Sequence, residues 1–495
     1  MLNESTNLTW QVATLVVLLL GISSPSLSEQ PLEFNNCELA TLDGRGSLSA
    51  QCSNWQQPLN AHKPNDKLID LFIVKLQSLS PAPQNDPLVI INGGPGGSSV
   101  DLLIDLASLN IFKLIRNRRD IIVLDQRGTG RSSPLSCPQL SENQIVTTDQ
   151  DTLLLAEECL SELNFDPRYF STSAAIIDID SLRRAIGYQS INIYGVSYGT
   201  RVAVQYAREF PQATRSLIVD GVVPPTLALG PDVPVNSQTA LDQVFEECAQ
   251  SRHCSLAFPK LEKNFKNLSA TLKTRPSMII VNDPLTGKPS EMDFSYEHLV
   301  LAVRMSLYNP ELRSLLPLLI YQGATEKNLT GIASTALQLI GQLQNTISNA
   351  MHNSVVCTED LPFTTSLKET IEASQSTYIG AEFFQTLKEI CSVWPPGVIS
   401  QNLKEPFKSA IPTLILSGEL DPVTPPSYGE LLASGLENSL HIIAKGQGHG
   451  IITRGCIPKL ISDFIDNPDV LQLDTSCTKD LSGVPFFVNS MGPSP

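Results

Sequence analysis

A serine between two glycines is the first indication of chemistry in this sequence. Gly195-Val196-Ser197-Tyr198-Gly199 follows an apolar run and precedes a run with helical periodicity. In a strand-turn-helix of this kind the serine hydroxyl projects from a tight turn, where larger side chains at the glycine positions would collide. The helix leaves main-chain N–H groups free near that hydroxyl. The motif predicts a nucleophilic serine, although an ordinary tight turn is the alternative interpretation.

A second glycine-rich segment could supply the electrostatic partner of that serine. Asn92-Gly93-Gly94-Pro95-Gly96-Gly97-Ser98 directly follows the apolar residues 88–91. Attack on a carbonyl group places negative charge on its oxygen, and N–H donors must already point at that oxygen. We expect the N–H groups of Tyr198 and Gly94 to form this oxyanion hole. A phosphate-binding loop is the alternative, but no Gly-Lys-Ser/Thr follows the glycines.

A nucleophilic serine also needs a base, and the base needs a carboxylate to orient it. The histidines that follow the serine are His253, His298, His352, His441 and His449. His449 is the best candidate by position, because it lies in a glycine-rich loop just past the last predicted strand. Asp421 follows the predicted strand 413–416 and leaves room for a helix and a strand before His449. Glu419 is the rival carboxylate, and we prefer Asp421 because Pro422 ends regular structure beside it.

The elements that must position these residues follow an α/β pattern. Short β-branched runs alternate with longer helical stretches, which is typical of a mostly parallel sheet flanked by helices. The predicted strands are Leu68–Leu76, Pro87–Asn92, Asp120–Asp125, Ile191–Tyr194, Ser216–Asp220, Thr413–Leu416 and Leu440–Ala444. The predicted helices are Val100–Leu114, Ala174–Ile186 and Thr200–Glu209. The candidate residues fall at the carboxyl ends of strands, where α/β folds place their ligands.

The alternation breaks after Asp220. From Val223 to about residue 406 the sequence is rich in helix-like segments, contains little that resembles a strand, and carries prolines at both edges. We interpret this region as a helical cap inserted between two strands of the sheet. The predicted organisation is a signal peptide at 1–28, a core at 29–224, the cap at 225–406, the rest of the core at 407–478 and a loosely ordered tail at 479–495.

The N-terminus indicates export. Residues 13–22 form an apolar run of the length of a signal h-region, too short to span a bilayer, and small residues near Ser28 suit signal-peptidase cleavage. Because Glu4 and no Lys or Arg precedes the run, a buried N-terminal helix is the alternative. Past the predicted signal no apolar stretch reaches the length of a membrane span, so we expect a secreted or periplasmic protein.

Ten cysteines agree with an oxidising compartment. They fall as near neighbours, and we expect sequential pairing as Cys37/Cys52, Cys137/Cys159, Cys248/Cys254, Cys357/Cys391 and Cys456/Cys477. A metal site at Cys248, His253 and Cys254 is the alternative, but no second ligand pair stands at zinc spacing. We therefore expect neither a metal nor another cofactor.

Composition excludes several classes of protein. The chain has 495 residues, 42% of them hydrophobic and 17% charged, which is ample for a large core and unlike a disordered chain. Its formal net charge is −16, so its surface repels the phosphate backbone of nucleic acids. The sequence carries no signal that fixes the oligomeric state.

Together these segments resemble the proline iminopeptidase and tripeptidyl aminopeptidase family of secreted α/β-hydrolases, which are serine exopeptidases. The matching segments are 93–98, Asp125-Gln126-Arg127-Gly128-Thr129-Gly130-Arg131-Ser132, 195–200, Asp220-Gly221-Val222-Val223-Pro224, Cys248…Cys254, Cys357-Thr358-Glu359, Cys391…Trp394-Pro395, 418–425 and 448–450. The cysteine and Trp-Pro matches favour the tripeptidyl branch. The resemblance implies an α/β-hydrolase fold with a cap, a triad of Ser197, Asp421 and His449, and peptide substrates with a free N-terminus.

An exopeptidase of this kind must also bind the α-ammonium group of its substrate. The resemblance points to Glu359 first, with Asp360 and Glu419 behind it. The family's histidine before the double glycine is Asn92 here, and proline-specific relatives commonly have Trp where Tyr198 stands, which disfavours strict proline specificity. A carboxylesterase or lipase is the alternative enzyme, because the same triad cleaves esters. A hydrolase-fold binding protein is the non-enzymatic alternative, although such proteins usually lack a member of the triad.

Overall fold

The computed structural model describes residues 32–41, 46–63, 66–137, 149–282, 287–364 and 366–493. The predicted signal peptide at residues 1–28 lies outside these ranges, so the prediction of export is not tested by the fold. Among the described residues, no helix has both the length and the apolar character needed to cross a membrane.

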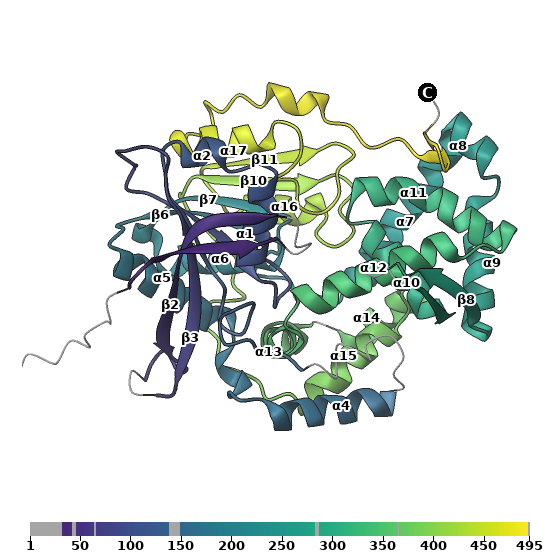
Figure 1. Cartoon of the computed structure of the whole chain (residues 1–495), viewed down its shortest axis with the longest axis horizontal. Helices are drawn as coiled ribbons and strands as arrows, with labels where there is room; N and C mark the ends of the chain where they lie inside the picture. The colour runs from purple at the N-terminus through teal and green to yellow at the C-terminus, as the bar shows by residue number, and fades with distance from the viewer. Residues whose placement is uncertain are drawn as a thin grey trace, which may run out of the picture. The chain divides into compact units, whose positions relative to one another are not determined.

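A nine-stranded sheet forms the centre of the described chain, in the order β1-β2-β3-β5-β4-β6-β7-β10-β11 (Figure 1). Its strands are β1 (Asn35–Ala40), β2 (Ser47–Pro58), β3 (Leu68–Leu76), β4 (Leu88–Ile91), β5 (Ile121–Leu124), β6 (Ile191–Val196), β7 (Thr214–Asp220), β10 (Thr413–Gly418) and β11 (Ser439–Ala444). The six strands from β5 to β11 run parallel, whereas β1, β2 and β3 pair antiparallel at one edge. All seven predicted strands are present, with ends displaced by at most two residues.

The central strands are buried on both faces, which explains their continuous apolar sequences. Every residue of β4 and β5 is buried, as expected for parallel strands covered by helices. Alternate side chains point to opposite faces: Ile91 and Ile193 enter one apolar cluster, whereas Ile90 and Tyr194 enter the other. These two clusters form the core and hold the strand ends in fixed register.

Helices cover both faces of the sheet. They are α1 (Ser99–Ser108), α2 (Lys113–Arg116), α5 (Thr172–Ile186), α6 (Tyr198–Glu209), α16 (Pro426–Ala433) and α17 (Ile457–Asp466). Helix α4 (Asp149–Glu162) packs instead against α15 (Glu382–Val393) (Figure 1). The predicted helix Val100–Leu114 is interrupted, because Asn110 adopts a positive φ of 56° and the chain leaves the helix there. Helix α5 could be predicted because both of its ends carry a sequence signal. Ser171 caps its N-terminus, and Gly187, at a φ of 89°, ends it.

The residues between β7 and β10 are mainly helical. They form α7 (Val233–Gln250), α8 (Arg252–Ala257), α9 (Leu261–Thr274), α10 (Tyr296–Ser306), α11 (Pro310–Tyr321), α12 (Thr330–Thr346), α13 (Asn349–Glu359), α14 (Leu367–Gln375) and α15 (Glu382–Val393). The expectation of little strand here is wrong in one place, because β8 (Ser277–Asn282) and β9 (Pro289–Phe294) form an antiparallel hairpin. The elements from α7 to α12 enclose an apolar cluster of their own, whereas Ala350, Met351 and Val355 of α13 belong to one of the two clusters of the sheet. The insertion therefore has its own core.

The structure confirms the expected disulfide pairs. The bonds are Cys37–Cys52, Cys137–Cys159, Cys248–Cys254, Cys357–Cys391 and Cys456–Cys477. The metal alternative is wrong for Cys248 and Cys254, because their sulfur atoms are bonded to each other.

The C-terminal tail is more regular than its composition indicates. Residues Phe487–Asn489 (β12) and Gly492–Pro493 (β13) form a short two-stranded sheet. Phe486 packs against the core of the insertion, and the guanidinium of Arg313 lies 5.5 Å from its ring. Figure 1 shows the tail, in yellow, running from α17 to α8. This segment therefore joins the second part of the sheet to the insertion.

Candidate active site

Ser197 occupies a strained turn between β6 and α6. Its φ is 56° and its ψ is −128°, a conformation that non-glycine residues rarely adopt. A Cβ atom at Gly195 would lie 2.4 Å from the carbonyl oxygen of Gly199, and one at Gly199 would lie 2.4 Å from the carbonyl oxygen of Ile91. Both positions therefore need glycine, as the motif predicts. The turn holds the Ser197 side chain partly exposed at the carboxyl end of the sheet.

The glycine-rich loop after β4 lies against this serine. A Cβ atom at Gly93 would come within 2.6 Å of the Ser197 Cβ atom. The N–H of Gly93 is already used, because it donates to the side-chain oxygen of Asn92 at 2.7 Å. In the described part of the chain, the N–H groups of Gly94 and Tyr198 have no hydrogen-bond acceptor. They are thus free for the charge that develops on a reacting carbonyl oxygen.

Asp125 fixes the start of α1 next to that loop. Its carboxylate accepts hydrogen bonds from the Ser98 hydroxyl at 2.9 Å and from the N–H groups of Val100 at 3.0 Å and Arg131 at 2.9 Å. Burial raises the pKa of Asp125, and these hydrogen bonds oppose the rise. Asp125 therefore braces the start of α1 beside the glycine-rich loop. Arg127 braces a different place, because it forms a buried ion pair with Asp178 of α5 at 2.7 Å.

Asp421 and His449 meet at the ends of β10 and β11. His449 Nδ1 lies 2.8 Å from Asp421 Oδ2. The Thr424 hydroxyl donates to the same carboxylate oxygen at 2.7 Å, and the other oxygen accepts the N–H groups of Val423 and Thr424. The Asp421 side chain is fully buried, whereas 12% of the His449 side chain is exposed. Burial lowers the pKa of His449, but the charge of Asp421 and its hydrogen bond raise that pKa above its usual value overall.

Asp220, at the end of β7, links the serine turn to the histidine loop. Its main-chain oxygen accepts the N–H of Ser197 at 2.9 Å. Its carboxylate accepts the N–H groups of Ile451 at 2.8 Å and Ile452 at 3.0 Å, just past His449. Burial raises the pKa of Asp220 to about 6. Among the described residues no direct hydrogen bond joins the Ser197 hydroxyl to His449, so Asp220 is the connection that the structure shows between them.

The insertion reaches this site at two points. The carbonyl oxygen of Tyr308, between α10 and α11, accepts the N–H of His449 at 2.8 Å, and the two rings meet edge to face at 5.2 Å. Near α13, the N–H of Ser348 donates to the carbonyl oxygen of Gly96 at 2.9 Å. His352 Nδ1 lies 3.3 Å from the carbonyl oxygen of Pro95. Both the histidine and the glycine-rich loop are therefore held partly by the insertion.

Two of the predicted amine-binding carboxylates lie in a buried cluster beneath α6. Glu359 accepts hydrogen bonds from the Thr172 N–H at 2.6 Å and from the Thr172 hydroxyl at 2.7 Å. Asp360 forms ion pairs with Arg201 at 2.7 Å and Lys404 at 3.1 Å. Burial raises the pKa of Asp360, yet the two cations lower it overall. Both carboxylates are buried and surrounded by partners from within the chain, which indicates a structural role.

The third predicted carboxylate, Glu419, has different surroundings. Its side chain is exposed and accepts the N–H of Gly446 at 2.8 Å. Of the histidines set aside, His441 contacts the Ser417 hydroxyl at 2.9 Å and His298 caps α10. Neither histidine contacts the residues of the serine turn.

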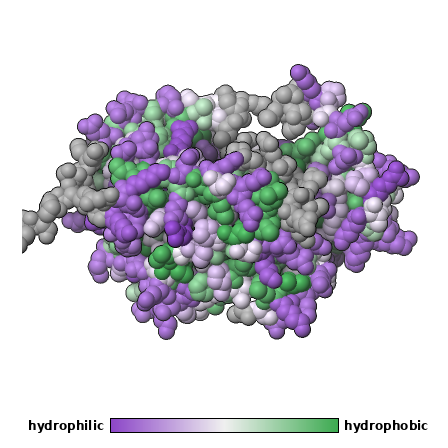
Figure 2. All heavy atoms as spheres, turned by 90° about the horizontal axis from the view of Figure 1, so that it is seen from below, coloured by the Kyte–Doolittle hydropathy of each residue, from purple (hydrophilic) through white to green (hydrophobic). Residues whose placement is uncertain are grey.

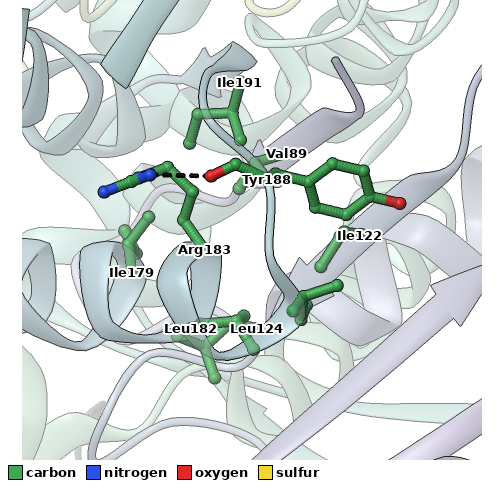
Figure 3. A pocket seen from close by; sticks show the side chains of 9 residues that line it. Val89, Ile122, Leu124, Ile179, Leu182, Arg183, Tyr188 and Ile191 are labelled. Atoms are coloured by element: carbon green, nitrogen blue, oxygen red, sulfur yellow. Dashed lines mark hydrogen bonds between the residues drawn. The ribbon is translucent and has the colours of Figure 1, made fainter. Parts of the chain in front are cut away.

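A small apolar pocket lies elsewhere (Figure 3). It is lined by Val89, Ile122, Leu124, Ile179, Leu182, Arg183, Ile186, Tyr188 and Ile191. Its lining includes the first residue of β6, at the amino end of the strand that carries Ser197 at its carboxyl end. The Arg183 guanidinium donates to the Tyr188 carbonyl oxygen at 2.7 Å on its rim. This pocket therefore lies at the other end of β6 from Ser197 and is not the candidate active site.

Sequence reasoning missed three residues of the site. Asp220 and Thr424 lie inside segments that the family resemblance already marks, so their positions were visible although their contacts were not. Tyr308 lies in no motif, and its contact with His449 depends on how the insertion folds back. A pattern within one segment could not reveal it.

Comparison with known proteins agrees with the fold. Residues 86–453 match the family described as alpha/beta hydrolase fold. The chain belongs to this family. Among the relatives of this hydrolase, serine protease Hip1 of Mycobacterium tuberculosis is 25% identical over 90% of both chains. Tripeptidyl aminopeptidase of Streptomyces coelicolor is 28% identical over 36% of both chains, and carboxylesterase B of M. tuberculosis is 23% identical over 87% of both.

Solved structures of the same family are more distant. The crystal structure of proline iminopeptidase from Mycobacterium smegmatis has a TM-score of 0.40 and 13% identity, covering 85% of this chain and 99% of that one. The relatives of this hydrolase therefore include proteins named as a serine protease and as a tripeptidyl aminopeptidase.

Proposed function

We propose that this hydrolase is a serine exopeptidase that cleaves peptide bonds near the free N-terminus of its substrates, of the tripeptidyl or prolyl aminopeptidase type. The observation that carries the proposal is the Asp421–His449 pair, tied through Asp220 to the strained turn of Ser197. Two free N–H groups, those of Gly94 and Tyr198, lie beside the same turn. These are the parts that acyl transfer needs at one place.

The steps follow from the positions of these groups. The Ser197 oxygen attacks the peptide carbonyl carbon while His449 Nε2 accepts the serine proton. The N–H groups of Gly94 and Tyr198 stabilise the resulting oxyanion. When the C–N bond breaks, His449 returns the proton to the leaving amine and an acyl-serine ester remains. Water then hydrolyses the ester by the same steps, with Asp421 fixing the imidazole tautomer throughout.

Relatives with peptidase names support a peptide substrate. Serine protease Hip1 matches along nearly the whole chain, and tripeptidyl aminopeptidase matches over about a third of it. For the substrate amine we propose Glu419 ahead of Glu359 and Asp360. Glu419 is exposed, whereas the other two carboxylates are buried in the cluster beneath α6.

Export is part of the proposal. Disulfides persist in oxidising compartments. The structure pairs all ten cysteines in five disulfide bonds. The apolar run at residues 13–22 would supply the signal.

The Ser197→Ala variant tests the mechanism. Its fold should persist, because only one oxygen atom is lost, while kcat/KM on a tripeptidyl anilide should fall by about 10⁴-fold or more. Circular dichroism and a thermal melt would show that the variant is folded. Near-normal turnover by a folded Ser197→Ala protein would reject the triad.

Free and N-acetylated forms of the same tripeptidyl anilide test the exopeptidase character. The free form should be cleaved faster, because only its ammonium group can pair with a carboxylate. Equal rates would favour an endopeptidase or an esterase. An esterase is the second candidate because the chain matches carboxylesterase B over most of its length, and a matched p-nitrophenyl ester measures that activity.

A further inference from the structure

The direction of the free N–H at Gly94 depends on the turn that contains it. This N–H and the carbonyl group of Gly93 belong to one peptide unit, whose bond is trans. In a trans peptide the two groups point in opposite directions. The Gly93 carbonyl oxygen accepts the N–H of Gly97 at 3.0 Å, which closes the turn. Whatever holds Gly97 in place therefore also sets the direction of the Gly94 N–H.

A short segment of the insertion, just before α13, holds Gly97 and its neighbour Gly96. Ile347 forms an antiparallel bridge with Gly97, and the Ser348 N–H donates to the carbonyl oxygen of Gly96 at 2.9 Å. The two segments fit closely, because a Cβ atom at Gly96 would lie 2.6 Å from the Ser348 carbonyl oxygen. The turn that carries the oxyanion donor thus rests against the insertion.

Helix α13 is in turn anchored to the core of the protein. The Asn349 side chain accepts the N–H of Cys137 at 2.9 Å and donates to the Cys137 carbonyl oxygen at 2.9 Å. The N–H of Met351 donates to the carbonyl oxygen of Leu135 at 3.0 Å. Met351 and Val355 also belong to one of the two apolar clusters of the sheet. The start of α13 is therefore a fixed support for the glycine-rich loop.

His352, in the first turns of α13, makes a further contact with this loop. Its Nδ1 atom lies 3.3 Å from the Pro95 carbonyl oxygen. A carbonyl oxygen can only accept, so Nδ1 must carry a proton and donate it to this hydrogen bond. In the described ranges of the chain, no other group donates to the Pro95 oxygen. The His352 side chain is thus the partner on which this carbonyl group depends.

We propose that His352 is a positioning residue of the oxyanion hole. Together with the main chain of Ile347 and Ser348, it holds residues 93–97 so that the Gly94 N–H points at the reacting carbonyl oxygen. Donors of this kind are effective because they are in place before the negative charge develops. The proposal rests on the proposed function, since that function makes Gly94 an oxyanion donor.

The His352→Phe and His352→Asn variants test the contact. Phenylalanine keeps a ring but has no donor, whereas asparagine loses the ring and keeps an N–H close to the position of Nδ1. In His352→Phe, kcat on a tripeptidyl anilide should fall by about 10- to 100-fold with KM nearly unchanged, because the transition state loses more than the bound substrate. His352→Asn should recover part of this loss. If His352 only filled space, phenylalanine would be the better replacement.

A boronic acid inhibitor measures the oxyanion hole directly. It adds to the serine as a negatively charged, tetrahedral boronate and so resembles the transition state. Its inhibition constant should rise in His352→Phe by about the same factor as kcat falls. His298→Phe is the matched control, because His298 also lies at the start of a helix of the insertion but contacts Ser295 and not the glycine-rich loop. This control should keep the wild-type kcat and inhibition constant.

Substitutions at Ser348 test the main-chain part of the support, and they do so even if His352→Phe does not fold. Proline lacks the N–H that donates to Gly96, whereas alanine keeps it. The φ of Ser348 is −74°, which suits proline. Ser348→Pro should therefore lose more of kcat, and more of the affinity for the boronic acid, than Ser348→Ala.

Three results would overturn the positioning role: wild-type kcat and boronic acid affinity in a folded His352→Phe variant, a loss that appears in KM alone, or a His352→Asn variant less active than His352→Phe. Failure of the proposed function is recognised separately, as hydrolysis of p-nitrophenyl butyrate without cleavage of any peptide. The same variants are then compared on this ester. Parallel losses of kcat and boronic acid affinity would keep the role of His352 and reject the peptidase.

Discussion

At the scale of single residues, the site pairs an enclosed carboxylate with an imidazole that is partly exposed. Asp421 is enclosed and accepts hydrogen bonds from Thr424, Val423 and His449, whereas His449 keeps one edge exposed. An enclosed carboxylate next to an accessible imidazole favours the imidazolium that forms as serine loses its proton. The same arrangement sets the pH range in which His449 is a base.

The pH profile of kcat/KM follows from this arrangement. Because the charge of Asp421 raises the pKa of His449 above its usual value, activity should fall on the acid side with a midpoint above 6.5, as the base becomes protonated. Initial rates on a neutral tripeptidyl anilide between pH 4 and pH 9 measure it. An acid limb centred well below that value would contradict the assignment.

Protonation of Asp220 could produce a similar fall in activity at acid pH, because burial raises its pKa to about 6. The Asp220→Asn variant separates the two. If His449 governs the limb, the variant keeps the limb, displaced to lower pH because the charge of Asp220 helps to raise the pKa of His449, and its overall activity falls. Loss of the limb in Asp220→Asn would assign the titration to Asp220.

Sequence could reveal the residue types of the site because glycine, proline and serine act through local geometry. Gly195 and Gly199 are required by contacts within the same turn, so five residues carry the whole signal. The role of Glu359 could not be read in this way. Its neighbours Thr172 and Arg201 come from α5 and α6, which are far away in the sequence. Their hydrogen bond and ion pair occupy the carboxylate that the motif predicts as a binding group for the substrate.

At the scale of elements, strands with an uninterrupted or nearly uninterrupted apolar run were predictable, including β3 and β11, which are only partly buried, whereas more polar strands were not. β4 and β5 are short apolar runs without interruption. β2 contains Ser, Gln and Asn and is exposed at several positions, β8 alternates between exposed and more buried residues, and the first three residues of β9 are all exposed. Such strands are stabilised by pairing with neighbours more than by their own sequence. The parallel strands and β3 could therefore be predicted, but the edge strands β1 and β2 and the hairpin of the insertion could not.

The cluster beneath α6 connects elements of the core and the insertion. Arg201 of α6 pairs with Asp360 at the end of α13, and the Tyr198 hydroxyl lies 2.7 Å from the Thr172 hydroxyl, which also contacts Glu359. Tyr198 is one of the two residues whose N–H groups we propose as oxyanion donors. The cluster therefore ties the end of α13 to the start of the helix that serves the active site.

The Asp360→Asn variant should destabilise the protein strongly. Removing one partner of a buried ion pair leaves an uncompensated charge and costs about 3–5 kcal/mol. Urea unfolding should show a lower midpoint with an unchanged slope. Lys266→Met is the matched control, because it removes an exposed ion pair on α9 and should leave the midpoint where it is. Equal midpoints for Asp360→Asn and the wild type would show that Arg201 and Lys404 find other partners.

At the scale of the whole molecule, the surface and the cross-links complete the description. On the face drawn in Figure 2, hydrophilic residues cover most of the surface and apolar residues form separate patches.

The disulfides are distributed over the fold: Cys37–Cys52 joins β1 to β2, and Cys357–Cys391 joins α13 to α15. Their pairing could be predicted because each cysteine bonds to its nearest neighbour in the sequence. The contacts between the insertion and the candidate active site could not be predicted, because they join residues more than a hundred positions apart in the sequence.

The cross-links should differ in their effect on stability according to the length of chain that each one closes. Cys357 and Cys391 are 34 residues apart, whereas Cys248 and Cys254 are 6 apart. If a disulfide acts mainly by restricting the unfolded chain, replacing both cysteines by alanine should cost about 4 kcal/mol for the long loop and about 2 kcal/mol for the short one.

Urea unfolding of the two double variants, without reductant, measures this difference. A larger loss for the short loop would mean that the Cys248–Cys254 bond acts on the folded state, by fixing α7 against α8. A larger loss for the long loop supports the unfolded-chain mechanism. Helix α13 also carries the contacts of His352 and Ser348 with the glycine-rich loop after β4. The variant without Cys357 and Cys391 should therefore also lose activity at urea concentrations at which its sheet is still folded.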